Sequence, residues 1–191
     1  MTTSPLLRAL SFVLVAVGLT GAARAHEPKL MSMLSAIDLV PTADQLRRVV
    51  TSPDVALDAV ARDASLSPYL RERAISLFSV SPTRDVAKRL EALASAPALP
   101  ARLRAMAVYT RVRGFAAVDA QAALAYATTL SRASDLDARE AAIRGLRWIA
   151  LPGADAVLAG AFVAETHPPL KATIQHVQRA RAELKRAAEA R

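Results

Sequence analysis

The chain has 191 residues, a net charge of +8 at neutral pH, no cysteine, and aromatic residues at only 4%. The lack of cysteine excludes disulfides and thiol nucleophiles, and six glycines leave no glycine-rich loop for a phosphate. Helix-forming alanine, leucine and arginine dominate while strand-forming residues are few, which predicts an all-α protein. The basic excess suits an anionic partner such as a lipid, a polysaccharide or an acidic protein, and it equally suits simple solubility.

Residues 1–25 have the pattern of a signal peptide. Arg8 supplies the basic region, Ala9–Thr20 is apolar, and the segment ends in Ala-Arg-Ala at Ala25. The apolar run is shorter than the roughly 20 residues that a membrane-spanning helix needs. We therefore expect cleavage after Ala25, no transmembrane segment after cleavage, and a periplasmic or secreted mature protein.

Two regions are expected after the signal peptide. Residues 26–42 form an N-terminal segment with one short helix at 30–39, and residues 43–191 form a helical domain. Polar residues and prolines mark the helix starts, as at Ser67-Pro68, because a polar cap accepts an orphan N–H and proline has none to leave unpaired. The expected helices of the domain are 43–51, 54–64, 69–80, 84–95, 101–114, 119–132, 137–151, 154–165 and 169–188.

One five-residue pattern recurs at spacings of 32 to 35 residues. Each copy has an aliphatic or small residue, a basic residue, two free positions and a small or branched apolar residue. The copies are Leu70–Ala74, Leu103–Ala107, Ala138–Ala142 and Leu170–Ile174. Such a period is typical of stacked helix pairs, in which neighbouring pairs bury a continuous core.

The pattern resembles HEAT repeats, especially the short bacterial type related to phycobilisome lyases. The resemblance implies a short right-handed α-solenoid of antiparallel helix pairs, with the motif-bearing helices lining a concave surface. It also implies that the basic residue of each motif joins a hydrogen-bonded ladder to an acid in a neighbouring turn. Arg71, Arg104, Arg139 and Lys171 match that position, but only Asp135 or Asp137 stands in a matching turn.

The leading functional hypothesis is a non-catalytic protein-interaction scaffold of the bacterial envelope or secretome. A concave helical surface suits a peptide segment or a partner helix, so the four motif cations are candidates either for the ladder or for contacts with a partner. Arg102 and Arg113 are expected on one side of their helix, and Arg104 and Arg111 on the opposite side. Trp148, the only tryptophan, is expected to fill the core.

The alternative hypothesis is binding to an anionic lipid or cell-wall polymer through the basic C-terminal helix. Its candidate contacts are Arg179, Arg181, Lys185 and Arg186. Nucleic acid is disfavoured as the partner, because no aromatic residues alternate with these cations to stack on bases.

The sequence shows no group of residues typical of a catalytic or metal-binding site. Of the three histidines, His167 and His176 are nine residues apart and His26 is distant from both, and no carboxylate stands at the spacing of known metal-binding helices. No cofactor is expected. An enzyme remains a remote alternative, because HEAT-like repeats occur in lyases and DNA-repair glycosylases.

Overall fold

The computed structural model describes residues 26–190, and this part of the chain contains ten α-helices, one 3-10 turn and no strand. The helices are α1 (Pro28–Ser35), α2 (Ala43–Val49), α3 (Pro53–Arg62), α4 (Pro68–Leu77), α5 (Arg84–Ala94), α6 (Ala101–Phe115), α7 (Ala120–Leu130), α8 (Leu136–Leu146), α9 (Gly153–Ala164) and α10 (Pro168–Glu189). The all-α prediction is confirmed for these residues. The predicted signal peptide lies outside them.

Local sequence explains where the helices begin. Proline occupies the first turn of α1, α3, α4 and α10. Thr42 forms a capping box with Gln45, and the side chains of Thr83, Asp119 and Asp135 accept backbone N–H groups at the starts of α5, α7 and α8. These bonds satisfy N–H groups that have no partner inside the helix.

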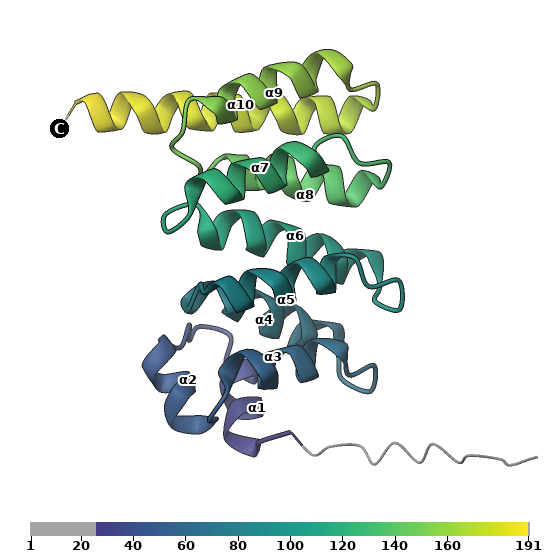
Figure 1. Ribbon diagram of the computed structural model, residues 1–191, viewed down its shortest axis with the longest axis vertical. Helices are drawn as coiled ribbons and strands as arrows, with labels where there is room; N and C mark the ends of the chain where they lie inside the picture. The colour runs from purple at the N-terminus through teal and green to yellow at the C-terminus, as the bar shows by residue number, and fades with distance from the viewer. Residues whose placement is uncertain (1–25, 191) are drawn as a thin grey trace, which may run out of the picture.

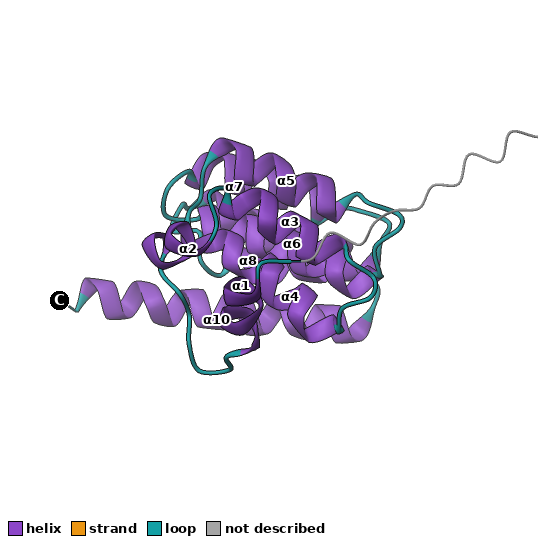
Figure 2. Ribbon diagram, turned by 90° about the horizontal axis from the view of Figure 1, so that it is seen from below, coloured by secondary structure: helices purple, strands orange, loops and turns teal. Residues whose placement is uncertain are grey.

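The helices form two layers (Figures 1 and 2). In one layer α4 contacts α6, α6 contacts α8, and α8 contacts α10. The helices α3, α5, α7 and α9 make the other layer, and each packs on the helix that follows it in the chain. The four motif copies therefore lie in the helices of one layer, while the C-terminal end of α10 projects beyond the stack (Figure 1).

The core lies between the layers and is made of aliphatic side chains. Leu90, Leu103, Ile143 and Ile174 are each 2% exposed or less. Two helices approach closely at Gly145, where an added Cβ atom would lie 2.6 Å from the Cβ of Val112. Glycine therefore lets α8 approach α6 more closely than alanine would.

The end of α8 differs from the prediction. The helix stops at Leu146 and not at residue 151, and the chain continues through a turn in which the Trp148 amide donates to the Gly145 carbonyl at 3.1 Å. In this turn Ile149 is fully buried, whereas Trp148 is 42% exposed. The prediction that Trp148 fills the core is wrong, because Ile149 takes the buried position.

Candidate functional site

The motif arginines Arg104 and Arg139 make equivalent bonds. Arg104 donates to the Leu99 carbonyl before its own helix at 2.7 Å and to Asp135 before the next motif helix at 3.2 Å. Arg139 likewise donates to the Ala133 carbonyl at 2.8 Å and to Glu165 at 3.2 Å. Each arginine thus joins the turn before its own helix to an acid in the turn before the next motif helix.

Surrounding donors favour the charged form of both acids. The backbone N–H of Ala138 is the largest cause that lowers the pKa of Asp135, and the Arg104 guanidinium adds to it. For Glu165 the His167 N–H is the largest cause that lowers the pKa, and Arg139 contributes as well. Both carboxylates are held by the fold and serve as internal partners.

The other two motif cations do not reach an acid. Arg71 is buried and its Nε donates to the Ala61 carbonyl of α3 at 2.9 Å. Lys171 lies over the Phe162 ring of α9, with Nζ 5.3 Å from the ring centroid. The four matching positions therefore tie helices together by three different kinds of contact, and all four side chains are engaged within the fold.

A groove of about 950 Å³ runs over α6, α8 and α10, which carry three of the motif copies. Its apolar lining includes Ala105, Met106, Ala141 and Val177. Its charged and aromatic lining consists of Arg102, Tyr109, Asp137, Glu140, Arg144, Arg147, Trp148 and His176. The groove thus combines apolar and polar lining, as ligand sites commonly do.

Trp148 is held at this groove by three neighbours. Its indole N–H donates to the Tyr109 hydroxyl at 3.2 Å. The guanidinium groups of Arg113 and Arg147 each lie 5.2 Å from the centroid of the Trp148 ring. Hydrogen bonding and cation–π attraction therefore fix an exposed indole in one orientation.

The groove cations differ in their partners. Arg102 pairs with Glu72 at 2.5 Å, and Arg144 pairs with Glu140 at 3.1 Å. None of the ion pairs among residues 26–190 includes Arg113 or Arg147. The Nε atom of Arg147 is buried and has no hydrogen-bond partner in this part of the chain. The positive charge beside Trp148 is therefore not neutralised internally.

The four arginines of α6 make different contacts. Arg102 and Arg113 are exposed, and Arg102 lines the groove while Arg113 lies against Trp148. Arg104 bonds to Asp135 before α8, whereas Arg111 is 5% exposed and faces α5 and α7. The sequence pattern missed Trp148, Tyr109 and Arg147 as site residues. The sequence did hold a signal that could have placed Trp148 near Arg113. The two residues are 35 positions apart, which is also the spacing of the motif arginines Arg104 and Arg139.

The predicted anionic-surface contacts of α10 need a correction. Arg181 is only 3% exposed, because it donates to the carbonyls of Leu146 and Ile149 and, at 2.7 Å, to Asp155. Lys185 also pairs with Asp155, at 2.5 Å. Arg181 is therefore wrong as a surface contact, and of the four residues only Arg179 and Arg186 are exposed without a carboxylate partner in the described chain.

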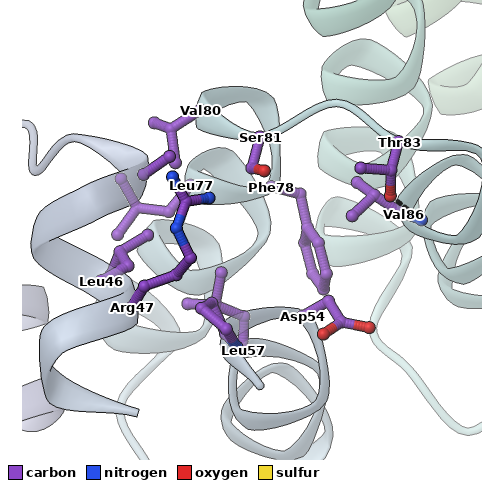
Figure 3. Close-up of a pocket in the computed structure, with 12 residues that line it drawn as sticks. Leu46, Arg47, Asp54, Leu57, Leu77, Phe78, Val80, Ser81, Thr83 and Val86 are labelled. Atoms are coloured by element: carbon purple, nitrogen blue, oxygen red, sulfur yellow. Dashed lines mark hydrogen bonds between the residues drawn. The ribbon is translucent and has the colours of Figure 1, made fainter. Parts of the chain in front are cut away.

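A second, smaller cavity of about 120 Å³ lies between α2, α3, α4 and α5 (Figure 3). Its walls include Leu46, Leu57, Leu77 and Phe78, and Asp54 at its edge pairs with Arg89 at 2.8 Å. A space of this size admits a few water molecules. The space is too small for a large ligand.

The predicted mature N-terminus also packs on the fold. The ring Nε2 of His26 lies 2.7 Å from Asp63, and hydrogen bonds from Ser65 and then from His26 lower the pKa of Asp63 to about 2. His167 precedes α10 and His176 lines the groove, so the three histidines do not come together.

Residues 26–190 contain no group of three or more histidine, aspartate or glutamate residues placed to hold a metal ion. No helix among them is long and apolar enough to cross a membrane. Comparison of the chain with protein-family models, with curated proteins and with solved structures finds no match.

Proposed function

We propose that this protein is a non-catalytic interaction scaffold of the bacterial envelope or secretome, built as a short right-handed α-solenoid of HEAT-like helix pairs. Two layers of successive helices, with the motif copies confined to one layer, support this architecture. The repeated bonds of Arg104 and Arg139 support it further, because they connect consecutive pairs in the same way. In this proposal the motif cations are structural and do not contact the partner.

The observation that carries the function is the exposed Trp148 in the groove of α6, α8 and α10. Exposing a large aromatic ring to water is unfavourable unless a partner covers it. Tryptophan, tyrosine and arginine are also the residue types that dominate binding energy at protein interfaces. Trp148, Tyr109, Arg113 and Arg147 bring these three types together at one place.

The test is capture of partners from the envelope fraction of the encoding bacterium, with residues 26–191 as wild-type bait and as Trp148→Ala bait. We expect a defined protein that survives a high-salt wash on the wild type and is lost on the variant. Loss of the indole removes contact area without changing the net charge. A difference between the proteins captured by the two baits therefore reports on the groove alone. A set of captured proteins that is identical for both baits would contradict the proposal.

Attachment to an anionic lipid or cell-wall polymer through α10 is the second candidate, and the projection of the α10 end beyond the stack favours it. The positive charge that α10 can offer to such a surface is reduced, because Arg181 and Lys185 both pair with Asp155. Binding to vesicles of anionic lipid should then collapse as salt is raised, because exposed charges are screened. Vesicle binding should also be weakened in the double variant Arg179→Gln, Arg186→Gln. Binding that changes neither with salt nor in the double variant would contradict this candidate.

A further inference from the structure

We propose that the groove of α6, α8 and α10 recognises an acidic peptide segment, with one of its carboxylates bound between Arg113 and Arg147 beside Trp148. The inference rests on the proposed function, and it adds the chemistry of the partner. It follows from which charges in the groove are already paired, how the aromatic rings are held, and how charge is distributed along the groove.

Arg147, which lines the groove, and Arg113, which lies against Trp148 beside it, are the cations available to an external anion. Arg102 and Arg144 already pair with acids of this chain. Arg113 is exposed and Arg147 is half-buried, and neither pairs with a carboxylate among the described residues. A carboxylate is the acceptor whose geometry best matches a guanidinium.

The aromatic pair supplies a preorganised apolar contact next to these cations. The hydrogen bond from the indole of Trp148 to the Tyr109 hydroxyl holds the two rings together, and Arg113 lies within 5.9 Å of the Tyr109 centroid as well. Side chains that are fixed before binding lose little entropy when a partner arrives. A segment with an apolar residue next to an acidic one therefore fits this end of the groove.

The opposite end of the groove argues for a peptide over a uniformly anionic polymer or membrane. Asp137 lines that end, is exposed, and pairs with no cation among the described residues, whereas Glu140 is already paired with Arg144. At 1.5 Å per residue, Asp137 and Arg147 stand about 15 Å apart along α8. A polyanion would meet repulsion at the Asp137 end, whereas a peptide can be acidic at one end only and place apolar side chains over Met106 and Val177.

The test uses a displayed library of random peptides, selected on the folded chain of residues 26–191. Trp148 is the only tryptophan of the protein, so binding of each tryptophan-free peptide is measured by the change in its fluorescence. We expect the selected peptides to be enriched in aspartate or glutamate next to an apolar residue. Their dissociation constants should rise about tenfold or more in Arg113→Gln and in Arg147→Gln, because a charge-assisted pair is lost.

Arg84→Gln is the matched control, since it removes one charge from the exposed start of α5, outside the groove lining, and should leave binding unchanged. Arg113 is exposed, so its variant keeps the test valid even where Arg147→Gln proves destabilised by circular dichroism. Selection of basic peptides that depend on Trp148 would overturn the acidic assignment and leave the proposed groove function standing. Recovery of no peptide that depends on Trp148 would overturn both. A response of Trp148 to polyphosphate or anionic vesicles, but to no acidic peptide, would overturn the peptide assignment.

Discussion

Arg181 is a buried cation that closes the end of α8. Its Nη1 donates to the Leu146 carbonyl at 2.8 Å and also to the Ile149 carbonyl, and its Nη2 reaches the Leu151 carbonyl at 3.3 Å. The last carbonyls of a helix have no partner inside the helix, and here a side chain of α10 supplies one. The same guanidinium bonds to Asp155, so α8, α9 and α10 meet at one residue.

Replacing Arg181 should therefore be far more damaging than replacing an exposed arginine of the same helix. We expect Arg181→Met to lower the free energy of unfolding by about 3–5 kcal/mol, because it leaves buried carbonyls unpaired. Arg186→Met, in the exposed part of α10, should change it by no more than about 0.5 kcal/mol. Urea unfolding followed by circular dichroism measures both, and equal midpoints for the two variants would show that Arg181 is not a structural cation.

Asp155 makes the same junction sensitive to acid. The hydrogen bond from Arg181 is the largest cause that lowers the pKa of Asp155 from 3.8 to about 2. A folded pKa below the unfolded one means that the stabilisation is present above pH 3.8 and is lost as the pH falls toward 2. We expect the unfolding free energy of Asp155→Asn to fall less than that of the wild type over this interval. Urea unfolding at a series of pH values measures these free energies. If they fell in parallel for the two proteins, the lowered pKa of Asp155 would not contribute to stability.

At the scale of helices, two glycines offer a matched comparison. Gly145 lies against Val112 of α6, where an added Cβ would come within 2.6 Å, whereas nothing lies within 4 Å of the Cβ position at Gly160 in α9. We expect Gly145→Ala to destabilise the protein by about 1–3 kcal/mol, because overpacking outweighs the gain in helix propensity. Gly160→Ala should stabilise it by about 0.5–1 kcal/mol, because only propensity changes. Thermal unfolding measures the change in stability of each variant. Midpoints that shift in the same direction for both would refute the close packing at Gly145.

The positions of the helices were predictable because their starts depend on local chemistry. Ser67-Pro68 and Asp135 act within a few residues of themselves, so a sequence pattern is enough to place α4 and α8. The exposure of Trp148 was not predictable in this way, because it depends on where α8 ends and on Ile149 filling the core. Glu165 was missed as the partner of Arg139 because it stands two residues earlier than the position aligned with Asp135, and its longer side chain spans the difference.

At the scale of the whole molecule, α10 covers the last layer of the core. Leu170, Ile174 and Val177 are each 3% exposed or less. Burying each such side chain contributes about 1.5–3 kcal/mol, so their sum is comparable with the total stability of an ordinary domain. Loss of α10 would therefore expose the apolar side chains on which these residues pack.

Two truncations should separate the buried part of α10 from its projecting end. A chain that ends at Thr166 lacks α10, and we expect it to aggregate or to lose its cooperative thermal transition. A chain that ends at Lys185 keeps the buried residues and the contact with Asp155, so its unfolding free energy should match that of the full chain within about 0.5 kcal/mol. Circular dichroism and light scattering measure both. A soluble, cooperative protein ending at Thr166 would show that α10 is dispensable to the core.

The bonds of Arg104 and Arg139 also bear on where the chain can be divided or lengthened. Each arginine lies in one helix pair and its acid lies in the turn that leads into the next motif helix, so a break made in the loop between pairs would separate every donor from its acceptor. A segment that keeps these bonds therefore runs from just before one motif arginine to just after the acid that precedes the next motif helix, as from Arg104 to Asp135 or from Arg139 to Glu165. Gene duplication or protein engineering that respects this boundary would carry each arginine together with its carboxylate.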